Sequence, residues 1–126
     1  MENKIKEIFQ ERFNSLSQYF QFTTLSVKDA YNSHEKYVIQ PGVYIFWKGN
    51  EIWKVGRHLT NARKRSLEHI RDNTQYLEYK MADLKLNPEA MVTYINVINP
   101  LDGFWIAALE IYMEIKLEPR IKSKRK

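Results

Sequence analysis

The chain has 126 residues, of which 44% are hydrophobic and 13% aromatic, so a single domain with its own core is expected and a disordered chain is excluded. It has no cysteine, which excludes a disulfide framework and a thiolate zinc site and fits a reducing cytoplasm. The first residues are followed by no apolar run long enough for a signal peptide or a membrane span, so a soluble cytoplasmic protein is expected.

The net charge of +5 is concentrated near the C-terminus. The segment from Lys116 to Lys126 holds six of the 20 basic residues and one of the 15 acidic residues, so the preceding part of the chain is neutral. Basic tails commonly bind nucleic-acid phosphates through the release of counterions. A solubilising terminus has the same composition, and the tail alone does not decide between the two.

The first 40 residues predict a helical N-terminal segment. Apolar side chains recur at helical spacing over residues 4–20, with charged side chains between them. A short second helix is predicted near residues 26–32, where Ser26 would cap the N-terminus and Asp29 would stand in the first turn. We expect this segment to cover the open side of a small sheet. Target recognition or a partner interface is the alternative, also for residues 73–87.

The rest of the chain alternates strand and helix signals. After Gln40-Pro41-Gly42, residues 43–46 and 52–55 predict two strands joined by residues 48–51, where Gly49-Asn50 is a turn signal. Thr60 or Asn61 would cap a helix running to about residue 72. A helix over 75–86, a third strand over 91–98 and a helix over 104–117 that stops before Pro119 complete the prediction.

A phenol and an amine lie on adjacent predicted strands. Side chains alternate between the faces of a strand, so Tyr44 shares a face with Phe46, and Ile52 shares one with Lys54. If the register brings these faces together, the Lys54 ammonium lies near the Tyr44 phenol and lowers its pKa, which would make Tyr44 a general base. The alternative is an ordinary core tyrosine beside a solvated strand lysine.

The helix predicted after the hairpin carries Arg65 and His69 four residues apart, so they share one face. A guanidinium matches phosphate oxygens, and an imidazole beside it can hydrogen-bond the phosphate or the attacking water. A solvated basic helix face is the alternative. We expect further nucleic-acid contacts from the neighbouring basic side chains and from the tail, namely Arg57, His58, Arg63, Lys64, Lys122, Lys124, Arg125 and Lys126.

Glu110 lies in a helix that is otherwise almost wholly apolar, with Glu114 on the same face. Burying a carboxylate is costly unless it is paired or binds a metal. A single carboxylate with several waters is a common way to hold Mg²⁺ in phosphoryl-transfer sites, so Glu110 is the candidate ligand for Mg²⁺ or Mn²⁺. A structural ion pair with an arginine, for example Arg65, is the alternative.

These pieces, in this order, resemble the GIY-YIG nuclease family over about residues 41–122. Gly42-Val43-Tyr44 is similar to the first motif of the family, and Lys54-Val55-Gly56 falls at the second. The helix arginine, the histidine four residues later and the metal-binding glutamate of a late helix match Arg65, His69 and Glu110. Lys54 stands where most members have a second tyrosine. A restriction-endonuclease branch of the family also has a lysine at this position, where it helps to activate the first tyrosine. Lys122 stands where an asparagine usually follows the late proline.

The resemblance implies an α/β fold of the α+β type: a three-stranded antiparallel sheet flanked by helices, with one divalent ion. Residues 1–40 would be a helical extension, residues 41–121 the nuclease domain and residues 122–126 a basic tail. The resemblance also implies hydrolysis of a DNA phosphodiester. In this reaction Tyr44 would deprotonate the attacking water, and Lys54 would lower the pKa of Tyr44. Arg65 would stabilise the developing charge, His69 would hydrogen-bond the phosphate and Glu110 would hold the metal.

The expected function is therefore a metal-dependent DNA endonuclease that needs no membrane. A catalytically silent domain of the same fold that binds nucleic acid or a protein is the alternative, and a purely structural or adaptor domain is a third interpretation. The target sequence, the choice between single-strand and double-strand cleavage, and the choice between monomer and homodimer are left open by the sequence.

Overall fold

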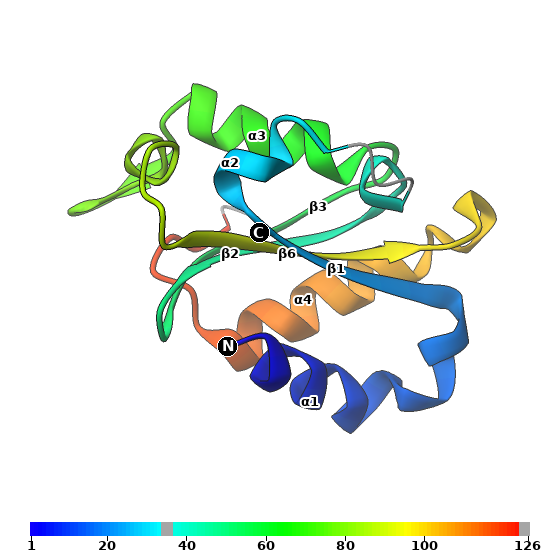
Figure 1. Cartoon of the computed structure of the whole chain (residues 1–126). Coiled ribbons are helices and arrows are strands. Elements are labelled where there is room, and N and C mark those ends of the chain that lie inside the picture. Colours follow the sequence, from blue (N-terminus) through cyan, green and yellow to red (C-terminus); the bar gives the residue numbers. More distant parts are fainter. Residues whose placement is uncertain (34–36, 124–126) are drawn as a thin grey trace.

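A four-stranded antiparallel sheet lies between two layers of helices (Figure 1). The structure is a computed structural model that describes residues 1–33 and 37–123. The sheet order is β1-β6-β2-β3. The strands are β1 (Phe20–Ser26), β2 (Gly42–Lys48), β3 (Glu51–His58) and β6 (Ala90–Val97). Helices α2 (Val27–Ala30) and α3 (Ala62–Arg71) cover one face, and α1 (Glu2–Phe13) and α4 (Trp105–Leu117) cover the other.

The mixed α/β class predicted from the sequence is confirmed, and so are most of its elements. Strands β2 and β3 form the expected hairpin, with Gly49 at φ 60° in the turn. The Ser26 hydroxyl accepts a hydrogen bond from the Asp29 amide at the start of α2, and the Asn61 side chain accepts one from the Lys64 amide at the start of α3. Helix α4 ends at Leu117, and Glu118, in the left-handed region, caps it directly before Pro119.

The sheet has one strand more than predicted. The helix predicted over residues 4–20 ends at Phe13, and a 3-10 helix (Asn14–Tyr19) leads into β1. Strand β1 pairs with β6 from Phe20↔Val97 to Ser26↔Met91. Residues 20–23 alternate phenylalanine with polar side chains, which is the period of a strand. The backbone hydrogen bonds of this strand are made with β6. The N-terminal segment is therefore not only helical.

The helix predicted over residues 75–86 is wrong. This segment forms a small hairpin of β4 (Gln75–Tyr76) and β5 (Tyr79–Lys80), followed by a 3-10 helix (Met81–Leu84). Leu77 lies at φ 54°, outside the helical region. The spacing of Leu77, Met81 and Leu84 matched a helix by coincidence. Met81 and Leu84 lie in the 3-10 helix and are buried, whereas Leu77 lies in the hairpin and is exposed.

Each face of the sheet buries its own apolar cluster. The cluster under α1 and α4 contains Ile5 and Phe9 of α1, Ile45 of the sheet and Leu109 of α4. The cluster under α2 and α3 contains Tyr44 and Tyr94 from the sheet together with side chains of the helical layer. Further 3-10 helices lie at Tyr37–Ile39 and Pro100–Asp102.

The segment after α4 folds back along the edge of the sheet. The amides of Arg120 and Ile121 donate to the carbonyls of Ile52 and Trp53 at 3.0 and 2.9 Å. Ile121 also forms a parallel bridge with Lys54. These bonds bring residues 120–123 alongside β3, the edge strand of the sheet. Within the described part of the chain, the helices are too short or too polar to cross a membrane.

Candidate active site

A β-bulge in the hairpin sets the positions of Tyr44 and Lys54. Phe46 pairs with Lys54 and Trp47 pairs with Ile52, so Trp53 is an extra residue in β3. Because of this extra residue, Ile52 and Lys54 do not share a face, contrary to the prediction. Ile52 packs in the cluster under α1 and α4, whereas Lys54 lines the same pocket as Tyr44. The bulge is thus what brings the amine to the side of the phenol.

Gly56 leaves room for the Tyr44 ring. The two residues are direct partners in the register, so they lie on the same face of the sheet. A Cβ atom at position 56 would collide with Cζ and Oη of Tyr44. The glycine is therefore required for the phenol to lie across the edge strand and reach the pocket.

The five predicted catalytic residues line one open pocket of about 970 Å³. Tyr44 comes from β2, Lys54 from β3, Arg65 and His69 from α3, and Glu110 from α4. Tyr44, Lys54, His69 and Glu110 are buried, and Arg65 is half-buried. The pocket lies at the β3 edge, where side chains from both layers of helices can meet.

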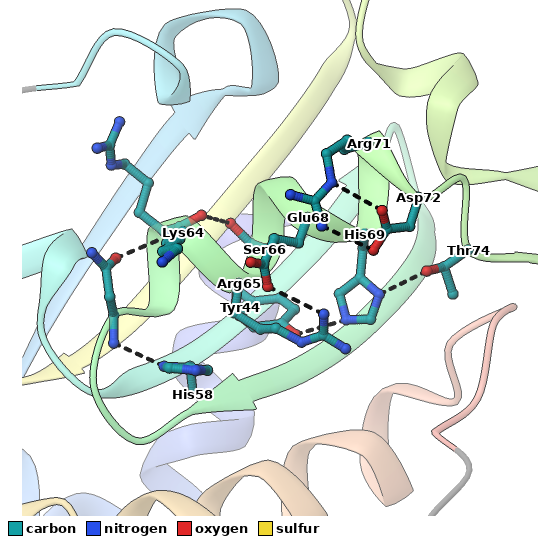
Figure 2. A network of polar contacts seen from close by, with 12 residues as sticks. Tyr44, His58, Lys64, Arg65, Ser66, Glu68, His69, Arg71, Asp72 and Thr74 are labelled. Atoms are coloured by element: carbon teal, nitrogen blue, oxygen red, sulfur yellow. Dashed lines mark hydrogen bonds and ion pairs between the residues drawn. The ribbon is translucent and has the colours of Figure 1, made fainter.

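Tyr44 and His69 form a hydrogen-bonded pair below α3 (Figure 2). The Tyr44 hydroxyl lies 2.9 Å from His69 Nε2. The other ring nitrogen, Nδ1, lies 2.8 Å from Oγ1 of Thr74. Thr74 follows the helix, and its amide also donates to the His69 carbonyl at 3.0 Å. Both nitrogens of the imidazole are therefore held, one by the candidate base and one by a hydroxyl.

The Tyr44 phenol does not have the lowered pKa expected from the sequence. Burial raises its pKa above the ordinary value of a tyrosine, and the positive charge of Arg65 lowers it by less. The negative charge of Glu110 raises it further. The expectation of a phenol activated in the unliganded protein is therefore wrong, because the desolvation of a phenolate outweighs the nearby cations.

The pKa of His69 lies below the ordinary value of a histidine. Burial, followed by the positive charges of Lys54 and Arg65, lowers its pKa to about 4. The imidazole is therefore neutral at pH 7 and able to accept a proton. Lys54 was predicted to lower the pKa of Tyr44, but its positive charge lowers the pKa of His69.

Arg65 holds its guanidinium at the pocket with help from its own helix. Its Nη1 lies 3.3 Å from Oε1 of Glu68, one turn further along α3. Figure 2 shows Arg65, Tyr44 and His69 pointing to the same side of α3. The arginine adds positive charge beside both members of the Tyr44–His69 pair.

Glu110 is 3% exposed and contacts two other pocket residues. Its Oε2 lies 3.7 Å from Nη1 of Arg57, and its Oε1 accepts a 3.4 Å hydrogen bond from the Ser123 hydroxyl. Arg57 is thus an ion-pair partner of Glu110. The Ser123 hydroxyl also contacts Glu114 Oε2 at 2.6 Å. Because a hydroxyl has a single proton, Ser123 donates mainly to Glu114, the nearer acid, and has Glu110 within reach of the same hydroxyl.

The donor chemistry around Glu110 fits a hard divalent cation that keeps most of its waters. A buried carboxylate that lines an open pocket is the ligand that Mg²⁺ prefers. Among residues 1–33 and 37–123, no group of three or more acidic or histidine side chains could hold a metal together. The protein would therefore supply one carboxylate, and water and substrate oxygens would supply the other ligands.

Of the residues predicted to contact nucleic acid, some line the pocket and others lie away from it. Arg57 and Lys122 are exposed and line the pocket. His58 instead accepts hydrogen bonds from the amides of Thr60 and Asn61 through Nδ1.

Arg63 donates to the carbonyls of Ala30 and Tyr31, away from the pocket, and Lys64 is exposed on the first turn of α3. Lys124, Arg125 and Lys126 lie outside the described residues. Of the described residues in this set, Arg57 and Lys122 are the two that line the pocket.

Apart from Lys122, sequence reasoning missed the polar pocket residues that come from the segment after α3 and from the C-terminal segment. Thr74 holds His69, Ser123 holds Glu110, and Gln75, Tyr76 and Arg120 line the pocket. The polar residues among them have no neighbouring pattern that would single them out. Only the tyrosine-rich composition of residues 75–80 carried a signal, because aromatic residues favour strands over helices.

The chain has no significant match among protein-family models, curated proteins or solved structures. Its function must therefore be inferred from the geometry of this pocket.

Proposed function

We propose that the protein is a metal-dependent endonuclease of the GIY-YIG type that hydrolyses DNA phosphodiester bonds. The observation that carries this proposal is the Tyr44–His69 hydrogen bond of 2.9 Å in a pocket that also holds Lys54, Arg65 and Glu110. A phenol and a neutral imidazole can move the proton of an attacking water, and two cations and a carboxylate with its metal can stabilise the charge that develops on a phosphodiester.

In this proposal, Tyr44 passes a proton rather than ionising alone. With Nδ1–H donated to Thr74 Oγ1, the lone pair on Nε2 of His69 faces the Tyr44 hydroxyl. Tyr44 takes the proton of the attacking water as it gives its own proton to His69. An isolated phenolate, which burial makes costly, then never has to form. The tyrosine acts as base only together with the histidine.

The bound phosphate makes this transfer easier. A pKa of about 4 makes His69 a weak base in the free protein, because burial, Lys54 and Arg65 oppose its protonation. A phosphate in the pocket would offset these two positive charges and raise the pKa of His69 toward neutrality. Proton transfer would therefore be easier when substrate is present.

The cations and the carboxylate stabilise the displacement itself. Arg65 and Lys54 lie where they can neutralise charge that grows on the phosphate oxygens. Glu110 would hold Mg²⁺ or Mn²⁺, and Ser123 would orient this carboxylate. A bound divalent ion would supply positive charge at the leaving oxygen.

The Arg57–Glu110 contact favours a second candidate function. A guanidinium 3.7 Å from the carboxylate occupies the neighbourhood in which a metal would bind. A silent domain that binds nucleic acid through Arg57, Arg65 and Lys122 would keep this ion pair permanently. In the nuclease, Arg57 must turn toward the phosphate when the metal enters, which its exposed position permits.

Incubation of supercoiled plasmid with the full chain and Mg²⁺ tests the proposal. The wild type should nick the plasmid, EDTA should stop it, and Glu110→Gln should reduce the rate by at least about 100-fold while losing Mn²⁺ binding seen by electron paramagnetic resonance. Glu7→Gln, an exposed helix carboxylate, is the matched control and should cut normally. Salt-sensitive DNA binding with no cutting by the wild type would instead establish the silent function.

A further inference from the structure

The hairpin of β4 and β5 stands at the rim of the pocket and exposes apolar side chains. Gln75 and Tyr76 line the pocket, and the hairpin projects from the body of the molecule at the left of Figure 1. The exposed fractions of Tyr76 and Leu77 are 58% and 70%. Neither side chain belongs to the two core clusters, so their apolar surface is not buried in the core.

The hairpin is held in place at its base and along one side. The Tyr79 ring packs edge-on against Trp53 at 5.2 Å between centroids, and its hydroxyl donates to Glu51 at 3.1 Å. The Arg120 guanidinium lies 5.5 Å from the same ring. At the base, the Met81 amide donates to the carbonyl of Thr74, the residue that contacts His69. The hairpin is therefore tied to the proposed catalytic pair.

The tip of the hairpin carries backbone strain. Leu77 has φ 54°, a conformation that costs a non-glycine residue on the order of 1 kcal/mol. Tyr76 and Tyr79 are direct partners across the two strands and so share a face. Because Tyr79 faces Trp53 and Arg120, Tyr76 lies on the side of the hairpin that borders the pocket.

The charge beside Tyr76 indicates what could cover its ring. Arg57, Arg120 and Lys122 are exposed and line the same pocket. A partner that matches both the cations and an exposed planar ring must be anionic and must offer flat apolar faces. A nucleic-acid strand has both, with phosphates spaced between bases that stack on aromatic rings.

We infer that Tyr76 stacks on a base of the DNA strand whose phosphate lies in the pocket. The hairpin would then position the strand, with Tyr76 contacting a base and Arg57 and Lys122 contacting phosphates. Stacking on a phenol ring tolerates any base, so this contact selects an accessible base rather than a sequence. The inference rests on the proposed binding of DNA but does not require that the DNA is cut.

Fluorescence anisotropy with a labelled single-stranded oligonucleotide in EDTA tests this contact without cleavage. Tyr76→Ala should weaken binding by about 5- to 150-fold, the range expected for the loss of one base–aromatic stack. Tyr76→Phe keeps the ring and should stay within about twofold of wild type. Tyr19→Ala removes another exposed tyrosine, 38% exposed and outside the pocket, and is the control.

The salt dependence separates stacking from charge. Tyr76→Ala should leave the slope of log affinity against log salt unchanged, whereas Lys122→Ala should reduce it by about 0.7, the value for one phosphate contact on a single strand. Wild-type affinity in Tyr76→Ala, with weakened binding in Arg65→Ala, would overturn the stacking contact and leave the proposed function standing. No salt-sensitive binding of the oligonucleotide by the wild type would also overturn the stacking contact, and the plasmid assay would then decide on the proposed function separately.

Discussion

The two faces of the sheet differ in what they bury. The face under α1 and α4 buries mainly phenyl and aliphatic groups, with Phe9 in ring contact with Phe13, Phe20 and Phe22. The face under α3 buries hydroxyl and imidazole groups, as in the Tyr44–His69 pair. Buried polar groups cost free energy unless they are paired, so they add little to stability. We infer that the first face provides most of the stability and the second provides the groups for proton transfer, while Glu110 reaches the pocket from α4 at the edge of the sheet.

The largest effect should come from the apolar face. Phe9 is 2% exposed, and Phe9→Ala removes its ring from three aromatic contacts and leaves a cavity. We expect the free energy of unfolding to fall by about 3–5 kcal/mol, measured by urea denaturation. Leu101→Ala, at an 82% exposed position, is the control and should change it by less than about 0.5 kcal/mol. A loss under about 1 kcal/mol for Phe9→Ala would show that this face is loosely packed.

A smaller, pH-dependent effect should come from the polar face. The pKa of His69 is about 4 in the folded chain and about 6.5 in the unfolded chain, so the unfolded state binds more protons between these values. His69 therefore favours folding fully above pH 6.5, and this contribution is lost as the pH falls toward 4. The loss should be about 3 kcal/mol, because each unit of difference between the two pKa values is worth about 1.4 kcal/mol. His69→Gln keeps a polar side chain and should remove this part of the pH dependence.

The measurement is urea denaturation of the wild type and His69→Gln at several pH values from 7 to 4. Carboxyl groups titrate in the same range, so the informative quantity is the difference between the two proteins. That difference should change across pH 6.5 to 4 and stay constant above pH 7. Parallel curves for the two proteins would mean that His69 has an ordinary pKa and a more open environment.

The elements with strong local signals could be predicted from the sequence. Gly49-Asn50 marks the hairpin turn, and Asn61 and Ser26 cap their helices as expected. The segments that failed depend on distant partners. Strand β1 forms because β6 offers its edge, and the β4–β5 hairpin forms because Tyr79 packs on Trp53. Neither contact is visible in a local pattern.

The candidate site divides in the same way. The sequence predicted that Tyr44, His69 and Glu110 belong together, and they line one pocket. It could not predict the bulge at Trp53, which needs the strand register. It also predicted the wrong direction for the Tyr44 pKa, because a spacing shows which charges are near but not how deeply a phenol is buried.

The central claim is that the Tyr44 hydroxyl transfers a proton in DNA cleavage, and a pair of buried tyrosines tests it directly. Tyr44 and Tyr94 are neighbours across β2 and β6, and burial raises the pKa of both, that of Tyr94 to about 12. Tyr44 contacts His69, whereas the Tyr94 hydroxyl contacts Ser66 at 2.7 Å. Each Tyr→Phe substitution deletes one buried hydroxyl from the same face of the sheet.

The measurement is single-turnover cleavage of plasmid DNA in Mg²⁺ by the wild type, Tyr44→Phe and Tyr94→Phe, with DNA affinity measured in EDTA. We predict that Tyr44→Phe binds DNA normally but cuts at least about 100-fold more slowly, the scale of general base catalysis. Tyr94→Phe should cut at nearly the wild-type rate, with a loss of stability of about 1 kcal/mol. Equal cutting rates for the two variants would contradict the role of Tyr44.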